Sequence, residues 1–120
     1  MARLLSRARL HRPEDFKAAL EQGRRVGTGL LSAAVRHNGL GIPRLGLALA
    51  KKNIALATMR NRIKRHIRES FREHQAALPS ADIVVFAKAS AARATQADLH
   101  AALEQLWQRV NQACATSPSF

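Results

Sequence analysis

Apolar residues recur every three to four positions in three stretches of this chain and every second position in others, which predicts helices and strands in alternation. Helices are expected from Pro13 to Gly23, from Met59 to Ala77 and from Thr95 onward. Strands are expected at 26–28, 30–35, 45–49 and 83–86. The order αβββαβα predicts an α+β fold in which helices pack on a small sheet of about four strands.

Local signals mark the ends of the helices. Pro13 at the first helical position is followed by two acidic residues, and Gly23 is expected to cap the first helix. The second helix should stop before Pro79, and Thr95 with Asp98 forms a capping box for the third.

The strand at 45–49 has two unlike faces, because leucines alternate with Gly46, Ala48 and Ala50. We expect the leucines to face the core and the small residues to leave their face open to another molecule. The run 83–86 is apolar throughout, which is typical of a central strand covered on both faces.

The long helix carries an apolar stripe and a basic ridge on different sides. Residues spaced four apart form the stripe: Met59, Ile63, Ile67 and Phe71. Four residues within about 60° of one another on the helical wheel form what we call the basic ridge: Asn61, Arg65, Arg68 and Arg72. Lys64 and Arg62 flank this ridge.

Positive charge is concentrated in this helix, since Arg60–Arg72 contains six basic residues and one acid. Like charges four residues apart destabilise an isolated helix by about 0.2–0.5 kcal/mol per pair. Contacts of Glu69 with Arg65 and Arg72 are expected to offset part of this cost. The remaining excess predicts an anionic partner, and the planar guanidinium of arginine suits phosphate.

The whole chain shares this bias, with 20 Lys and Arg against 8 Asp and Glu and a net charge of +12. Nucleic acid and anionic membrane are the usual partners of such a surface. Membrane binding would need a broad exposed apolar face, whereas the apolar stripe is needed here for the core. A DNA-binding helix-turn-helix would need a short helix before the long one, and here a strand and two lysines precede it. RNA is therefore the favoured partner.

A chain of 120 residues fits one domain, and we expect a single RNA-binding domain at 1–113 and a disordered tail at 114–120. Cys114 is the single cysteine, so no intramolecular disulfide is possible and a reducing compartment is expected. No apolar run reaches the roughly 18 residues of a membrane span. We expect a cytoplasmic, unprocessed protein that does not bind membranes.

The sequence closely resembles the protein subunit of bacterial ribonuclease P over roughly residues 5–112. The matching segments are Arg44–Asn53 (RLGLALAKKN) and Arg60–Arg72 (RNRIKRHIRESFR), with further matches at Arg7, Arg9, Leu10, Asp15, Phe16, 83–88, Leu103, Leu106 and Trp107. The Arg-Asn-Arg box at 60–62 and the residues downstream of it are the most specific part.

The resemblance implies a fold like the second domain of ribosomal protein S5, with a left-handed crossover around the long helix that departs from the usual right-handed rule. It also implies two partners, ribonuclease P RNA and precursor tRNA. The RNA subunit would hold the catalytic Mg²⁺, and the holoenzyme, an endoribonuclease, would hydrolyse the phosphodiester that frees the mature 5′ end. The protein is expected to be a monomer in a 1:1 complex with the RNA, with no catalytic residue, cofactor or metal of its own.

By position, the resemblance assigns ribozyme contacts to Arg60, Asn61, Arg62, Lys64, Arg65, Arg68 and Arg72. It assigns the 5′ leader of precursor tRNA to a cleft between the first helix and the sheet, with Arg9, Phe16, Lys51 and Lys52 at or near it.

Two interpretations of Phe16 stay open. Either its ring stacks on a base of the leader, which would contribute about 1–3 kcal/mol to binding, or it is a residue of the core. The family often has a second aromatic residue where this chain has Leu20, and the chain has no Tyr. Ring contacts from the sheet are therefore not expected.

Two rival functions compete with this one. An autonomous metal-dependent nuclease would need clustered carboxylates, but the closest pair on one helix face, Glu69 and Glu73, lies among arginines. A ribosomal protein that binds ribosomal RNA would have a similar composition and charge. Only the box at 60–62 argues against that second alternative.

Overall fold

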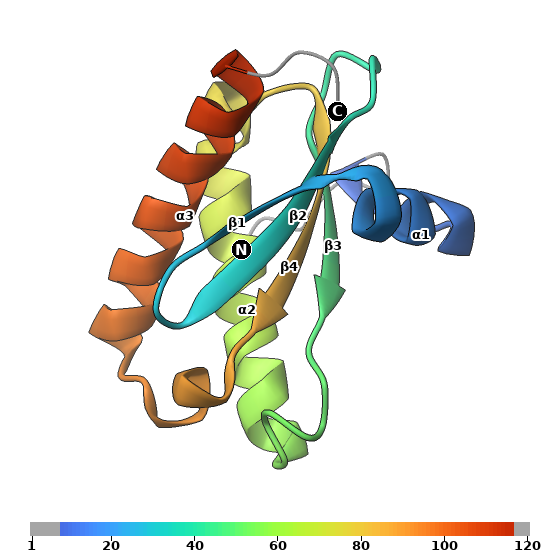
Figure 1. The fold of residues 1–120 in the computed structure, drawn as a ribbon. Coiled ribbons are helices and arrows are strands. Elements are labelled where there is room, and N and C mark those ends of the chain that lie inside the picture. The colour runs from blue at the N-terminus through green and yellow to red at the C-terminus, as the bar shows by residue number, and fades with distance from the viewer. Residues whose placement is uncertain (1–7, 117–120) are drawn as a thin grey trace.

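Every predicted helix and strand is present in the computed structural model, which describes residues 8–116, although most ends are shifted (Figure 1). The helices are α1 (Pro13–Gln22), α2 (Ala57–His74) and α3 (Gln96–Thr116). The strands are β1 (Arg24–Gly27), β2 (Leu31–His37), β3 (Arg44–Ala48) and β4 (Ala81–Ala87). Two short 3-10 helices are η2 (Gln75–Ala77) and η3 (Ala89–Arg93).

Gly23 ends α1 as predicted, but for a different reason. Its N–H donates a hydrogen bond to the Ala19 carbonyl at 3.0 Å, while its φ of −76° is not left-handed. A Cβ atom at this position would lie 2.3 Å from the Ala19 oxygen and 2.8 Å from the Val35 oxygen. The glycine is therefore required by the close approach of two backbones rather than by a special φ.

The ends of the other helices are partly corrected by the structure. The Thr95–Asp98 capping box is confirmed, with reciprocal hydrogen bonds of 3.0 and 3.1 Å. The last turn expected for α2 is the separate 3-10 helix η2.

The predicted disordered tail was placed too early. Residues 114–116 are helical, because Cys114 packs against the core and the Thr116 hydroxyl donates to the Gln112 carbonyl at 2.9 Å. The rest of that tail, 117–120, and the basic segment at 1–7 lie outside the described residues.

The sheet has the strand order β1-β2-β4-β3, with β3 parallel to β4 and the other pairs antiparallel. Helix α2 connects the two parallel strands. In Figure 1 both arrows point down, β4 lies to the left of β3 and α2 passes behind the sheet, so the crossover is left-handed. This is the exception to the right-handed rule that the family resemblance predicted.

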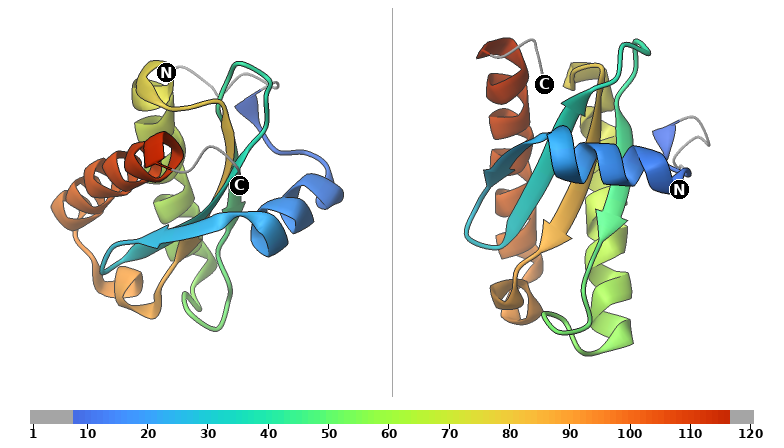
Figure 2. Two further views of the ribbon diagram at one scale, coloured as in Figure 1. Left: turned by 45° about the horizontal axis from the view of Figure 1, so that its top comes forward. Right: turned by 45° about the vertical axis from the view of Figure 1, so that its right-hand side comes forward.

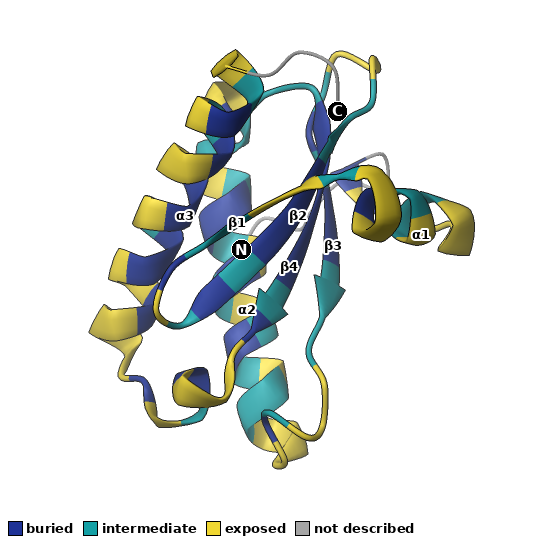
Figure 3. Cartoon of the chain, in the orientation of Figure 1, coloured by how far each residue is buried: buried dark blue, intermediate teal, exposed yellow. Residues whose placement is uncertain are grey.

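The two faces of the sheet are covered unequally. Helices α2 and α3 pack on one face and α1 crosses the other (Figure 2). In β4, Ile83 and Val85 join the large core, while Val84 joins a small cluster with Leu10 and Ala19 under α1. Buried residues concentrate in the strands and on the inner sides of α2 and α3 (Figure 3). The prediction of a central strand covered on both faces is confirmed at 83–85, whereas Phe86 stays partly exposed.

Polar and ring contacts fix how α2 sits on α3. The apolar stripe is buried as predicted at Ile63, Ile67 and Phe71. The Trp107 indole N–H donates to the Ser70 hydroxyl at 2.8 Å, and its ring meets the Phe71 ring edge-on at a centroid distance of 6.0 Å. These contacts set the rotation of α2 about its own axis.

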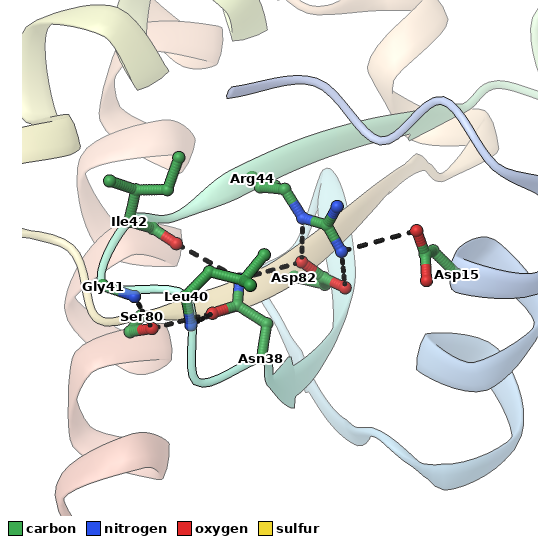
Figure 4. A network of polar contacts seen from close by, with 8 residues as sticks. All are labelled: Asp15, Asn38, Leu40, Gly41, Ile42, Arg44, Ser80 and Asp82. Carbon is green, nitrogen blue, oxygen red and sulfur yellow. Dashed lines mark hydrogen bonds and ion pairs between the residues drawn. The ribbon is translucent and has the colours of Figure 1, made fainter. Parts of the chain in front are cut away.

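A buried polar network ties α1 to the sheet (Figure 4). Arg44 on β3 donates two hydrogen bonds of 2.8 Å to the Asp82 carboxylate on β4, which is 1% exposed and also accepts from Asn38 at 2.9 Å. A second contact, 3.4 Å long, joins Arg44 to Asp15 on α1. The hydrogen bonds from Arg44 to Asp82 raise the pKa of the Arg44 guanidinium above its ordinary value, so this group stays charged.

Replacing Asp82 by Ala should lower the free energy of unfolding by about 2–3 kcal/mol, because the half-buried Arg44 cation would lose its bidentate partner. The loss is not larger because water can still reach part of the Arg44 side chain. Urea denaturation measures this difference. The control Glu21→Ala removes an exposed carboxylate that faces Lys17 at 4.0 Å and should change stability by less than about 0.5 kcal/mol. Equal effects of the two variants would contradict the role given to the network.

The α2–α3 contact should also depend on pH through His74. Its Nδ1–H donates to the Ser70 carbonyl at 2.8 Å and its Nε2 lies 3.1 Å from Glu104, and these contacts, with nearby Glu73, raise the pKa of His74 above its ordinary value. The stabilisation is therefore complete below about pH 6.5 and is lost as pH rises through the folded-state pKa.

Glu104→Gln should lower the free energy of unfolding at about pH 5.5 by less than about 1 kcal/mol, because the pair is partly exposed. The loss should be smaller at about pH 8.5. Thermal unfolding at the two pH values measures the difference. Glu104 also lies 3.6 Å from His100, so the same substitution in a His74→Gln background isolates the His74 contribution. A loss that is equal at both pH values would contradict this assignment.

Candidate nucleic-acid interface

The outer face of α2 is a cationic surface that carries little counter-charge. Asn61, Arg65 and Arg68 of the basic ridge are exposed. The two acids of the helix lie toward α3 instead, where Glu69 and Glu73 line a pocket with His66 and His100. Charge is therefore segregated around the helix axis.

The expected contacts of Glu69 with Arg65 and Arg72 are wrong. Within residues 8–116, no arginine of α2 lies within 4.0 Å of a carboxylate oxygen. Glu69 is turned toward the α3 side by the same rotation that buries Phe71. The cations on the outer face thus remain available to an external anion.

Three arginines predicted to contact RNA are also held by, or partly buried in, the protein itself. Arg60 donates through Nη1 to the carbonyls of Ile54 and Ala55, each at 2.8 Å, and so ties the segment before α2 to the helix. Arg62 contacts the Met59 sulfur at 3.7 Å.

Arg72 leaves the predicted ridge. Arg72 is half-buried, and its Nε atom is buried with no hydrogen-bond partner in the part of the chain that the structure describes. The exposed part of the ridge is thus shorter than the wheel predicted, and it consists of Asn61, Arg65 and Arg68.

An open pocket of about 240 Å³ lies beside the ridge, and we call it the Phe16 pocket. It is lined by Arg9, Leu10, His11, Phe16, Leu45, Gly46, Leu47, Lys64 and Arg68. None of these lining residues is acidic. Lys64 and Arg68 come from α2, so the pocket and the basic ridge form one continuous surface around the β3 edge.

Phe16 is seated on the small-residue face of β3. A Cβ atom on Gly46 would lie 2.8 Å from two Phe16 ring atoms and 2.9 Å from Leu10 Cδ1. The prediction that this face stays open is therefore wrong at Gly46, although the leucines do face the core. The ring is half-buried against Ala34 and Val84 and also lines the pocket, so both interpretations of Phe16 describe part of its surface.

The predicted leader residues are only partly brought together. Arg9 bridges to Leu45 at the β3 edge and lines the Phe16 pocket with Phe16 itself. Lys51 and Lys52 are exposed in the turn between β3 and α2 and do not line the pocket. The turn is linked to β4 by Asn53, whose side-chain amide donates to the Ala87 carbonyl at 3.1 Å.

The sequence interpretation missed one ring on this side of the sheet. Phe86 is only partly buried and packs against the same small cluster as Phe16. The signal was available, since Val84 and Phe86 are two residues apart in one strand and must share a face. The absence of Tyr and of a ring at position 20 therefore does not leave this face without an aromatic side chain.

Two further findings concern residues 8–116 alone. No helix there is long and apolar enough to cross a bilayer. No three His, Cys, Asp or Glu side chains there gather in a group that could hold a metal ion.

Gly46→Ala should displace the Phe16 ring and lower the free energy of unfolding by about 1–2 kcal/mol, since overpacking outweighs the entropic gain of replacing glycine. Gly29→Ala is the matched control, because nothing lies within 4 Å of a Cβ there, and it should be neutral or slightly stabilising. Urea denaturation compares the two variants. A Gly46→Ala protein as stable as the control would show that the ring is not seated on this glycine.

Proteins whose family is known are similar to this chain over most of its length. The family model for ribonuclease P matches residues 4–111. The ribonuclease P protein component of Aliivibrio fischeri is 44% identical over 104 residues, which cover 87% of this chain and 89% of the relative. That of Yersinia pestis is 48% identical over 101 residues, which cover 84% and 85%.

Solved structures agree with the sequence relatives. The ribonuclease P protein of Staphylococcus aureus superposes with a TM-score of 0.81 at 29% identity, over 87% of this chain and 97% of that one. That of Thermotoga maritima gives 0.76 at 29% identity, over 85% and 96%. These matches confirm the predicted resemblance and favour it over the ribosomal-protein alternative. This chain belongs to the ribonuclease P protein family.

Proposed function

We propose that this chain binds the catalytic RNA of ribonuclease P through α2 and the 5′ leader of precursor tRNA at the Phe16 pocket. The holoenzyme then hydrolyses the phosphodiester that gives the mature tRNA 5′ end. The observation that carries the proposal is the unpaired cationic face of α2, which continues through Lys64 and Arg68 into the pocket.

The ribozyme surface consists of the exposed ridge residues, Asn61, Arg65 and Arg68, with Lys64 beside them. Arginine forks on a rigid helix bind phosphate oxygens without further ordering of the backbone. Arg60, Arg62 and Arg72 remain in the proposed contact set through their partly exposed edges. Arg60 has the additional role of holding the 54–55 carbonyls, so its replacement would affect folding as well as binding.

The leader surface consists of Arg9 and Phe16, and Lys51 and Lys52 contribute positive charge nearby in the β3–α2 turn. A half-exposed ring beside cations is suited to a single strand, because bases stack on the ring while the cations neutralise phosphates. Lys64 and Arg68 belong to both surfaces. The leader and the ribozyme would thus meet at the β3 edge.

Catalysis is assigned to the RNA subunit, with Mg²⁺ held there and no catalytic residue on the protein. The protein is proposed to act as a cytoplasmic monomer in a 1:1 complex with the RNA. In this arrangement it contributes positioning and charge neutralisation at the strand to be cut.

Reconstitution with a bacterial ribonuclease P RNA at low Mg²⁺ tests the function. The complex should cleave precursor tRNA at the mature 5′ end faster than the RNA alone, because the protein replaces counterions that Mg²⁺ would otherwise supply. The protein alone should cleave nothing. Failure to stimulate the RNA, or efficient Mg²⁺-dependent processing by RNA-free protein, would overturn the proposal.

Arg65→Ala should weaken binding to the catalytic RNA and reduce the magnitude of the slope of log K against log salt concentration by about 0.7–0.9, the value of one phosphate contact. Filter binding or fluorescence titration over a salt series measures the slope. Arg93→Ala, which removes an equal charge from exposed η3, is the control and should leave the slope unchanged. An unaltered slope for Arg65→Ala would remove Arg65 from the interface.

A further inference from the structure

The face of the sheet that carries α1 has a second ring next to the Phe16 pocket. Strand register places Phe86 between Ser32 on β2 and Ala48 on β3, and Ser32 in turn opposite Gly27 on β1. Phe86 is therefore the one large side chain in a row that crosses all four strands. Its immediate neighbours in that row are too small to cover its ring.

Both incompletely buried rings of the described chain lie on this one face. Its other aromatic side chains, Phe71 and Trp107, are buried between α2 and α3. Phe16 and Phe86 are half-buried against a shared cluster. Phe86 is two residues beyond Val84, which pairs with Gly46, so it lies about 7 Å further along the sheet than the seat of Phe16.

Arg25 of β1 lies over this second ring. The centre of its guanidinium lies 4.7 Å from the centroid of the Phe86 ring, and the residue is exposed. Within residues 8–116, no carboxylate oxygen lies within 4.0 Å of it. A guanidinium is planar. When one of its faces lies against a ring, its other face and its N–H edge can still contact a ligand.

We propose that Phe86 and Arg25 form a second stacking position for a base of single-stranded RNA. The inference rests on the proposed function, because the strand concerned is the one that enters the Phe16 pocket. A base stacks on the outer side of the Arg25 guanidinium, which lies over the Phe86 ring, and a phosphate of the same strand neutralises its charge.

Three features select RNA as the occupant. The surface is cationic in a chain of net charge +12, which is complementary to a phosphate backbone. Phe86 packs against the same small cluster as Phe16, at a spacing that neighbouring unstacked nucleotides can span. It also supplies a ring contact from the sheet in a chain whose position 20 is Leu and which has no Tyr. Because the contact is made to π faces, it should tolerate any base.

The test uses the full chain and a single-stranded RNA oligonucleotide that carries 2-aminopurine, whose fluorescence falls when it stacks. Phe86→Leu keeps an apolar side chain but removes the ring, and Arg25→Lys keeps the charge but removes the planar group. Each should weaken binding by about 5-fold or more and reduce the quenching, as expected for the loss of one stacked base.

Arg24→Ala is the matched control, because Arg24 is equally exposed on the same strand but points to the opposite face. It should leave the quenching unchanged. Wild-type binding by Arg25→Lys would show that Arg25 acts only through its charge, and wild-type binding by Phe86→Leu would show that the ring is only packing. Either result overturns the proposal. If Phe86→Leu unfolds, the exposed Arg25→Lys still decides the question.

A second measurement separates this inference from the proposed function. In the reconstituted holoenzyme, Phe86→Leu and Arg25→Lys should bind the catalytic RNA and mature tRNA as the wild type does, and should lose affinity for precursor tRNA alone. Equal losses for precursor and mature tRNA would overturn the stacking position while leaving the function intact. A wild-type protein that fails to bind the catalytic RNA would overturn the function, and the oligonucleotide titration would still test the stack.

Discussion

The rotation of α2 about its axis is the constraint on which the rest of the surface depends. The hydrogen bond from Trp107 to Ser70 and the edge-on contact with Phe71 allow one orientation of this helix on α3. That orientation turns Glu69 and Glu73 toward α3 and leaves Arg65 facing outward. A helix with alternating charge would neutralise itself, whereas this one keeps its acids and its outward cations on separate sides. A buried polar contact thereby decides where the positive potential of the molecule lies.

The position of α1 depends on a second set of buried contacts at one end of the sheet. The Arg44–Asp82 pair fixes β3 beside β4, and its contact with Asp15 holds the first turn of α1 over the same strands. Phe16 follows Asp15 directly and is thereby placed over Gly46. The pocket is thus preorganised from two sides, by α1 above the sheet and by Lys64 and Arg68 of α2 around its edge. Rigid placement of this kind limits the ordering cost when a flexible strand binds.

Local sequence signals predicted what depends on local physics. The spacing of Ile63, Ile67 and Phe71 reports burial, and the Thr95–Asp98 box reports a helix start, so both were confirmed. Contacts between distant segments leave no such periodic trace. The hydrogen bonds from Arg60 to the 54–55 carbonyls depend on a turn conformation, and the contact of Arg25 with the Phe86 ring depends on strand register. The left-handed crossover likewise came from family resemblance, because no residue pattern in the chain distinguishes it from its mirror connection.

The two edges of the sheet differ in a way that bears on how the protein behaves before it meets RNA. Residues 9 and 10 run beside β3 and occupy part of that edge, with the Leu10 N–H donating to the Leu45 carbonyl at 3.0 Å. The β1 edge is short and carries two consecutive exposed arginines, Arg24 and Arg25. Charged side chains on a short edge strand discourage pairing with the edge of another copy. Arg25, which would receive a nucleic acid, therefore also helps Arg24 to discourage edge-to-edge aggregation of newly made protein, and this protection is strongest while no RNA neutralises the charge.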